Sequence, residues 1–175
     1  RPAGGPRGAG RRMRVIPRAV AWSEDGTSVR IIDQRALPHA LRYLDLRTLD
    51  QVVDAIQALA VRGAPAIGVA GAMGLAVIAA SQARRQPALA PREFVAAVDD
   101  AATRIAAARP TAVNLPWAIA RLRRLVATEM ALEPVRLAAA LHDEAEHIRA
   151  DDEAMCARIG AHGAPLLRDG ARVMT

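Results

Sequence analysis

Residues 62–68, with the sequence RGAPAIG, could bind an anion at the start of a helix. Pro65 favours the first helical turn, and Gly63 allows the backbone to approach a ligand closely. The unpaired N–H groups around Gly63 and Ala64 would then point toward the ligand, at the positive end of the helix dipole. Arg62 adds a guanidinium group that can hold a phosphate by paired hydrogen bonds. The same residues could instead form only a tight helix connection with an exposed arginine.

Residues 109–118, with the sequence RPTAVNLPWA, form a second candidate. Arg109 precedes a proline, which keeps it out of helical geometry at the end of a helix. Thr111 and Asn114 could cap the next helix or donate hydrogen bonds to a polyol. Arg62 and Arg109 each lie beside a proline-bearing helix junction and could converge on one phosphate, although their spacing alone does not require it.

The other reactive side chains fit no metal or nucleophile motif. Of the four histidines, His142 and His147 lie five residues apart, so they diverge on a helix. Cys156 is expected to pack among apolar neighbours, and no base lies near it in the sequence to activate a catalytic thiol. One cysteine allows no internal disulfide and is typical of a reducing compartment. We expect neither a metal nor a catalytic residue among these side chains.

The net charge of +6 arises in residues 1–18, which contain six arginines and no acid. The remaining residues carry 18 Arg and 18 acids, so the rest of the chain is balanced. We expect residues 1–18 to form a disordered basic tail, because its Gly, Pro and Arg residues cannot bury enough apolar surface. The tail could bind anions weakly or be upstream sequence. It contains no aromatic residue, so nucleic-acid binding is not expected.

Residues 63–83 contain no charged side chain and are about long enough to cross a bilayer. A helix that is apolar on every side belongs either in a core or in a membrane. The segment is mostly Ala and Gly, which lack the strong insertion preference of Leu, Ile and Phe. We therefore expect a core helix and no membrane association.

The pattern predicts a mainly α fold that begins with a short β-hairpin, formed by residues 19–22 and 28–33 around a turn. Ala supplies 41 of the 175 residues, which favours closely packed helices over a sandwich or barrel. Apolar residues at helical spacing predict five helices. They begin near Thr48, Pro65, Glu93, Asn114 and Pro134; the first should end at Arg62 or Gly63, and the fifth at Gly160 or Gly163. The helix face with Arg121, Arg123 and Arg124 should be solvated.

Residues 171–175 (ARVMT) read as the opening of a buried strand. A lone strand would leave its backbone groups without partners, so we expect a longer protein with a further α/β domain. The predicted organisation is a tail at 1–18, a hairpin and helical domain at 19–130, and a connecting helix with the start of a truncated α/β domain at 131–175.

From about Val20 to Thr175, the chain resembles the amino-terminal part of the methylthioribose-1-phosphate isomerases, the aldose–ketose isomerases of methionine salvage. The resemblance rests on motifs in family order: Trp22 with the hairpin, DQRALP at 33–38, VRGAPAIG at 61–68, RPTAVNLPWA at 109–118 and the segment 151–175. Ribose 1,5-bisphosphate isomerases and the regulatory subunits of a translation-initiation exchange factor share the broader fold. The DQ..LP segment and the pair Asn114 and Trp117 favour the methylthioribose branch.

The resemblance implies a helical domain packed on a Rossmann-like domain, in a cytoplasmic homodimer that needs no cofactor. It implies that Arg62, Gly63, Ala64 and Arg109 bind the substrate, a small sugar phosphate. The family's catalytic Cys and Asp would follow Thr175, so Cys156 does not take that role. The reaction would convert 5-methylthioribose 1-phosphate to 5-methylthioribulose 1-phosphate in amino-acid biosynthesis. Because the anomeric oxygen is phosphorylated, ring opening and the hydrogen shift would need an acid and a base.

Two alternatives remain open. The chain could belong to a ribose 1,5-bisphosphate isomerase-like enzyme. It could also belong to a non-catalytic regulatory or interaction subunit that senses a sugar phosphate with the same fold.

The 175-residue chain alone is predicted to show no isomerase activity, because the acid and base are expected outside it. The measurement is ketose formation from 5-methylthioribose 1-phosphate by the purified chain. Turnover would contradict this prediction and place an acid and a base within these residues.

Overall fold

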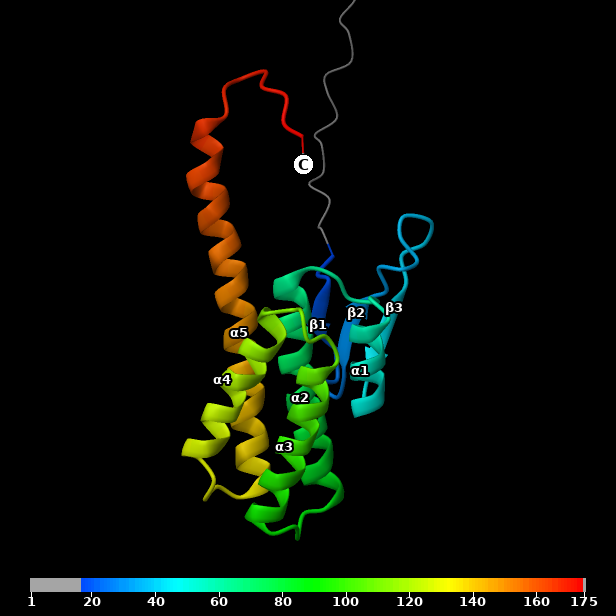
Figure 1. Ribbon diagram of the computed structural model, residues 1–175, viewed down its shortest axis with the longest axis vertical. Helices are drawn as coiled ribbons and strands as arrows, with labels where there is room; N and C mark the ends of the chain where they lie inside the picture. The colour runs from blue at the N-terminus through cyan, green and yellow to red at the C-terminus, as the bar shows by residue number, and fades with distance from the viewer. Residues whose placement is uncertain (1–16, 175) are drawn as a thin grey trace, which may run out of the picture.

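The structure is a computed structural model that describes residues 17–174 as a small sheet followed by a helical bundle (Figure 1). The elements in chain order are β1 (Val20–Trp22), β2 (Val29–Ile32), β3 (Tyr43–Leu46), α1 (Leu49–Gln57), α2 (Ala64–Arg85), α3 (Pro91–Ala107), α4 (Asn114–Thr128), α5 (Pro134–Gly163) and the short 3₁₀ helix η1 (Ala164–Leu166). The predicted mainly α class, with strands first and helices after, is confirmed. Of the predicted tail, only Pro17 and Arg18 belong to the described residues.

The sheet is antiparallel with the order β1-β2-β3, so the predicted hairpin gains a third strand. Val20 pairs with Ile31 across the first ladder, and Val29 pairs with Leu46 across the second. The central strand buries Val29 and Ile31, and the sheet packs on α2. The sequence did not predict β3, because its four residues are too short for a clear alternating pattern.

Helix α1 begins as predicted and ends earlier. Thr48 forms a capping box with Gln51: the Gln51 N–H donates to Thr48 Oγ1 at 3.3 Å, and the Thr48 N–H donates to Gln51 Oε1 at 3.2 Å. The helix stops at Gln57 because Leu59 adopts a left-handed conformation with φ 56°. The Ala60 N–H then donates to Ala55 O, as in a Schellman motif. The expected end at Arg62 or Gly63 was wrong, because Leu59 occupies the position where glycine usually signals this turn.

Helix α2 forms the centre of the bundle and contacts every other helix from α1 to α5 as well as β1 and β2. Its length and apolar composition would suffice to cross a membrane, but 13 of its residues are buried among the surrounding elements. The prediction of a core helix is confirmed.

Three glycines on α2 allow close approach of the neighbouring helices. A Cβ atom at Gly68 would lie 2.8 Å from the backbone oxygen of Asn114, at the start of α4. A Cβ atom at Gly71 would overlap the side chain of Leu115, and one at Gly74 would lie 2.7 Å from Val52 Cγ1 on α1. Because these glycines recur every three residues, they leave a strip of bare backbone on α2 for α1 and α4 to contact.

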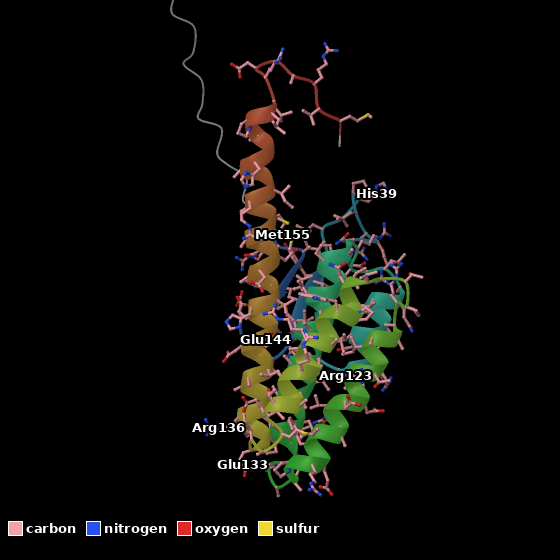
Figure 2. All side chains as sticks on the ribbon, turned by 60° about the vertical axis from the view of Figure 1, so that its left-hand side comes forward. His39, Arg123, Glu133, Arg136, Glu144 and Met155 are labelled. Carbon is pink, nitrogen blue, oxygen red and sulfur yellow. The ribbon has the colours of Figure 1, made fainter. Side chains whose placement is uncertain are left out.

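Helix α5 packs on the bundle in its first half and extends beyond it in its second half (Figures 1 and 2). Its last buried residue is Ile148, and residues 153–162 are all exposed. Cys156 lies in this exposed part, so the expectation of a packed thiol was wrong. Residues 171–174 are also exposed and form no strand, since no described strand offers them hydrogen bonds.

Gly68→Ala is predicted to destabilise the fold by about 1 to 3 kcal/mol, because the new methyl group would press on rigid backbone. Alanine's better helix propensity, worth about 1 kcal/mol, offsets only part of this loss. Gly160→Ala is the matched control: it lies in α5 with nothing within 4 Å of its Cβ position, so it should stabilise slightly. Urea unfolding measures both, and a Gly68→Ala protein as stable as the parent would contradict the close approach.

Candidate functional site

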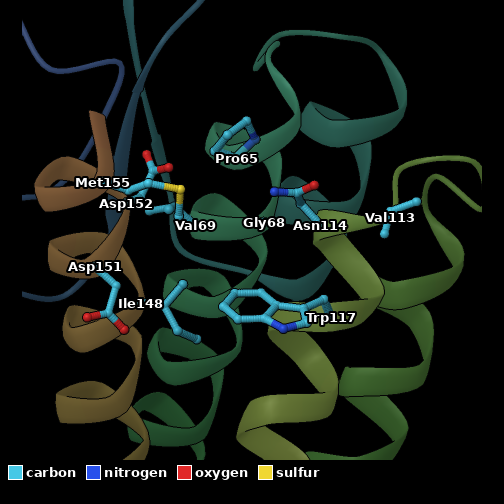
Figure 3. A pocket seen from close by; sticks show the side chains of 10 residues that line it. All are labelled: Pro65, Gly68, Val69, Val113, Asn114, Trp117, Ile148, Asp151, Asp152 and Met155. Carbon is cyan, nitrogen blue, oxygen red and sulfur yellow. The ribbon is translucent and has the colours of Figure 1, made fainter. Parts of the chain in front are cut away.

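The amino-terminal ends of α2 and α4 meet at one end of the bundle. Gly68 in the second turn of α2 faces the backbone of Asn114, the first residue of α4. This contact brings the segments 62–66 and 109–114 to the same end of the molecule. The two segments singled out from the sequence are therefore neighbours in space (Figure 3).

The start of α2 has the geometry of an anion cradle. Gly63 is the N-cap with φ 97°, a conformation that other residues rarely adopt, and it supplies no side chain to cap the helix. The first intrahelical bond runs from the Ile67 N–H to Gly63 O, so the preceding N–H groups find no acceptor among residues 17–174. Gly63 and Ala64 are exposed. The free donors thus face solvent at the positive end of the helix dipole.

Arg62 and Arg109 lie in the segments that lead into α2 and α4. Arg62 is exposed, and its Nε donates to Leu59 O at 3.1 Å. Its own carbonyl accepts a bond from Gln34 Nε2 at 3.4 Å, which ties the loop after β2 to the cradle. Arg109 is half-buried just after α3. Within the described residues, neither guanidinium pairs with a carboxylate.

Helix α4 starts without the side-chain cap that Thr111 or Asn114 was expected to provide. Val113 is the N-cap, and no side chain bonds to the first turn. In the first turn of α4, the Leu115 N–H donates a hydrogen bond to Ala112 O, and this bond satisfies only part of the N–H groups there. The side chain of Asn114 instead lies against an adjoining pocket (Figure 3).

That pocket has a volume of about 310 Å³ and opens between α2, α4 and α5. Its lining is mainly apolar, with two carboxylates at one side (Figure 3). The lining residues are Pro65, Gly68, Val69, Val113, Asn114, Trp117, Ile148, Asp151, Asp152 and Met155. The sequence did not predict this pocket, because the residues of α5 that close it lie more than thirty positions beyond Trp117. The one local signal was an aromatic residue directly after a helix start.

Trp117 is half exposed and extends from α4 toward α5. The guanidinium of Arg121 lies over its ring, 5.9 Å from the centroid. Arg121 itself binds two carboxylates of α5, Glu144 through Nε and Asp151 through Nη1 at 2.8 Å. The expectation of a solvated Arg121 was therefore wrong: its side chain is only 24% exposed and links two helices. Arg123 likewise binds Asp99 of α3, at 2.7 Å.

A second set of contacts attaches β1 to α5 close to the pocket. The ring of Trp22 stacks on His142 with centroids 4.1 Å apart, and its Nε1 donates to Glu146 Oε2 at 3.0 Å. Arg149 binds Glu146 and Glu153. The hydrogen bond from Arg149, assisted by that from Trp22, lowers the pKa of Glu146 to about 2. His142 thus packs on an aromatic ring.

A metal site would need at least three suitable ligands close together. Among residues 17–174, His, Cys, Asp and Glu side chains form no such group. The chemistry that this end of the molecule offers is anion binding by arginines and backbone N–H groups, next to an apolar pocket.

Residues 60–175 match the initiation factor 2 subunit family. The chain is 51% identical over 157 residues to the methylthioribose-1-phosphate isomerase of Gemmatimonas aurantiaca. The matched region covers 90% of this chain and 44% of that protein. Among solved structures, it is similar to 5-methylthioribose 1-phosphate isomerase from Pyrococcus horikoshii OT3, with a TM-score of 0.80, 34% identity, and coverage of 89% of this chain and 42% of the other. It is also similar to translation initiation factor eIF-2B, subunit delta, from A. fulgidus, with a TM-score of 0.71, 36% identity, and coverage of 87% and 42%. The chain therefore spans less than half the length of these relatives.

The fold should lose stability in acid as Glu146 becomes protonated. The pKa of Glu146 is about 2 in the folded protein, against an ordinary value of 4.5. The ionised carboxylate therefore adds to the free energy of unfolding above about pH 4.5, and this contribution is lost as the pH falls toward 2. Glu146→Gln should reduce stability at pH 6 and flatten this dependence, measured by urea unfolding from pH 2 to 6. Asp143→Asn, an exposed carboxylate on the same helix, is the control. Equal pH slopes in the parent and Glu146→Gln would contradict the pairing.

Proposed function

Because the chain belongs to the initiation factor 2 subunit family, we propose that it is the substrate-binding part of an isomerase that converts 5-methylthioribose 1-phosphate to 5-methylthioribulose 1-phosphate. The observation that carries this proposal is the meeting of the α2 and α4 amino-terminal ends, each preceded by an arginine. The 51% identity to a methylthioribose-1-phosphate isomerase supports the choice of activity within the family.

In this proposal, the phosphate binds at the start of α2. Gly63 and Ala64 present backbone N–H groups at the positive helix end, where a doubly charged phosphate is favoured. Arg62 and Arg109 approach from either side with charge-assisted hydrogen bonds. Gln34 helps to hold the backbone of Arg62 by its bond to that carbonyl.

The proton transfers are assigned to groups outside this chain. The phosphate on the anomeric oxygen prevents direct enolisation of a free aldehyde, so the ring must open before hydrogen moves between adjacent carbons. Both steps need an acid and a base within hydrogen-bond reach of the sugar. We expect a Cys and an Asp from the part of the relatives that this chain does not span, in a cytoplasmic homodimer of the methionine salvage pathway that needs no cofactor. Residues 19–130 would form the binding domain, and α5 would lead to the second domain.

A non-catalytic role is the second candidate. It is favoured by the similarity to the delta subunit of eIF-2B, which matches this fold with a TM-score of 0.71. Such a protein would bind a sugar phosphate at the same helix ends without turning it over. A ribose 1,5-bisphosphate isomerase-like enzyme would use the same phosphate site and differ at the other end of the sugar. Assays of the full-length gene product with both sugar phosphates separate the three possibilities.

Arg109→Ala in the full-length gene product should weaken substrate binding by about tenfold or more, because a hydrogen bond to a charged group is worth roughly 1.5 to 3 kcal/mol. Steady-state kinetics with 5-methylthioribose 1-phosphate measure the effect as a rise in KM or a fall in kcat/KM. Arg124→Ala, which removes an exposed arginine in the second half of α4, should change neither. Unchanged kinetics in Arg109→Ala would refute the assignment.

A further inference from the structure

We propose that the apolar pocket between α2, α4 and α5 receives the methylthio group of the substrate, and that Trp117 determines specificity for it. The inference rests on the proposed function. It gives a binding place to the C5 end of the sugar, which is the end that the arginines do not hold.

The pocket adjoins the proposed phosphate site on both helices. Pro65 and Gly68 line it from the first two turns of α2, directly after the cradle at Gly63. Val113 and Asn114 line it from the start of α4, a few residues after Arg109. A ligand whose phosphate lies at the start of α2 therefore has this pocket beside it, where the C5 substituent of the sugar can extend.

The lining suits a thioether. An indole, aliphatic side chains and the sulfur of Met155 make most of the surface, while a methylthio group forms only weak hydrogen bonds and gains from leaving water. Sulfur also contacts aromatic rings favourably, which the indole of Trp117 provides. Asp152 of α5 also lines the pocket, and its carboxylate can accept hydrogen bonds from sugar hydroxyls (Figure 3).

Trp117 is held in place for this task by Arg121, which does not itself line the pocket. Arg121 lies over its ring and is anchored to Glu144 and Asp151 of α5. The indole on α4 is thereby fixed relative to α5, which forms the opposite wall of the pocket. A side chain half exposed at a helix surface would otherwise be free to change rotamer. Arg121 is a positioning residue in this arrangement.

The experiment compares two substrates that differ only at C5: 5-methylthioribose 1-phosphate, and 5-deoxyribose 1-phosphate, which lacks the methylthio group. In the full-length gene product, Trp117→Ala should lower kcat/KM for the first by about tenfold or more, the range expected for lost apolar contacts, and change it less than about twofold for the second. Trp117→Phe should retain most of the preference. The ratio of the two kcat/KM values is the readout, since a purely structural defect would lower both alike.

Three further variants make the outcome decisive. Val135→Ala removes an exposed apolar side chain at the other end of α5 and should leave the ratio unchanged. Met155→Ala, on the exposed part of α5, should lower the ratio in the same direction as Trp117→Ala, and it tests the pocket if the tryptophan variant does not fold. Arg109→Ala should lower both kcat/KM values without changing their ratio.

The results separate the two proposals. Trp117→Ala and Met155→Ala proteins that keep the parent ratio, or lose both activities equally, overturn the methylthio pocket and indicate that another part of the protein packs there. If Arg109→Ala still lowers both activities, the phosphate assignment stands in that case. If Arg109→Ala has no effect, the phosphate assignment fails independently of the pocket, and a parent protein that turns over neither substrate overturns the proposed function.

Discussion

The close approach of α4 to α2 is the contact on which the rest of the molecule depends. It is possible because Gly68 and Gly71 place no side chain between the two helices. The backbone of α2 therefore meets the backbone of Asn114 at Gly68 and the side chain of Leu115 at Gly71. A bulkier α2 would hold α4 away and separate the two arginine-bearing segments. Chain packing and the geometry of the candidate site therefore have the same physical cause, the small residues on one face of α2.

Most of the fold could be predicted from the sequence, because the helices carry strong local signals. Thr48 and the prolines at 65, 91 and 134 mark helix starts through capping and first-turn preferences, and these act within a few residues. The errors fall where local rules are weak or broken. Leu59 takes a left-handed conformation that normally calls for glycine, and β3 is held by its pairing with β2 more than by its own pattern.

Of the candidate site, the sequence predicted the anion cradle but not the pocket beside it. The anion cradle and the two arginines lie in two short motifs, and the residue types of these motifs indicate anion binding. The pocket beside them depends on α5, and nothing in the order of residues shows that Ile148 and Met155 come to face Trp117. The same limit applies to Arg121, which looked like a solvated charge on α4 until α5 placed Glu144 and Asp151 against it. Cys156 shows the converse: its apolar neighbours suggested a core, but at that point α5 has left the bundle.

The meeting of two helix starts also has an electrostatic consequence. The positive dipole ends of α2 and α4 lie together, and the segments that lead into these two helices carry the positively charged Arg62 and Arg109. Like charges at one end of the bundle repel each other. Of the two carboxylates that line the pocket, Asp151 is paired with Arg121, whereas Asp152 forms no ion pair among the described residues. An anion at the start of α2 would remove much of that repulsion. The packing that forms the core thus brings positive charge together at this end of the bundle, and the phosphate of the proposed function would compensate that charge.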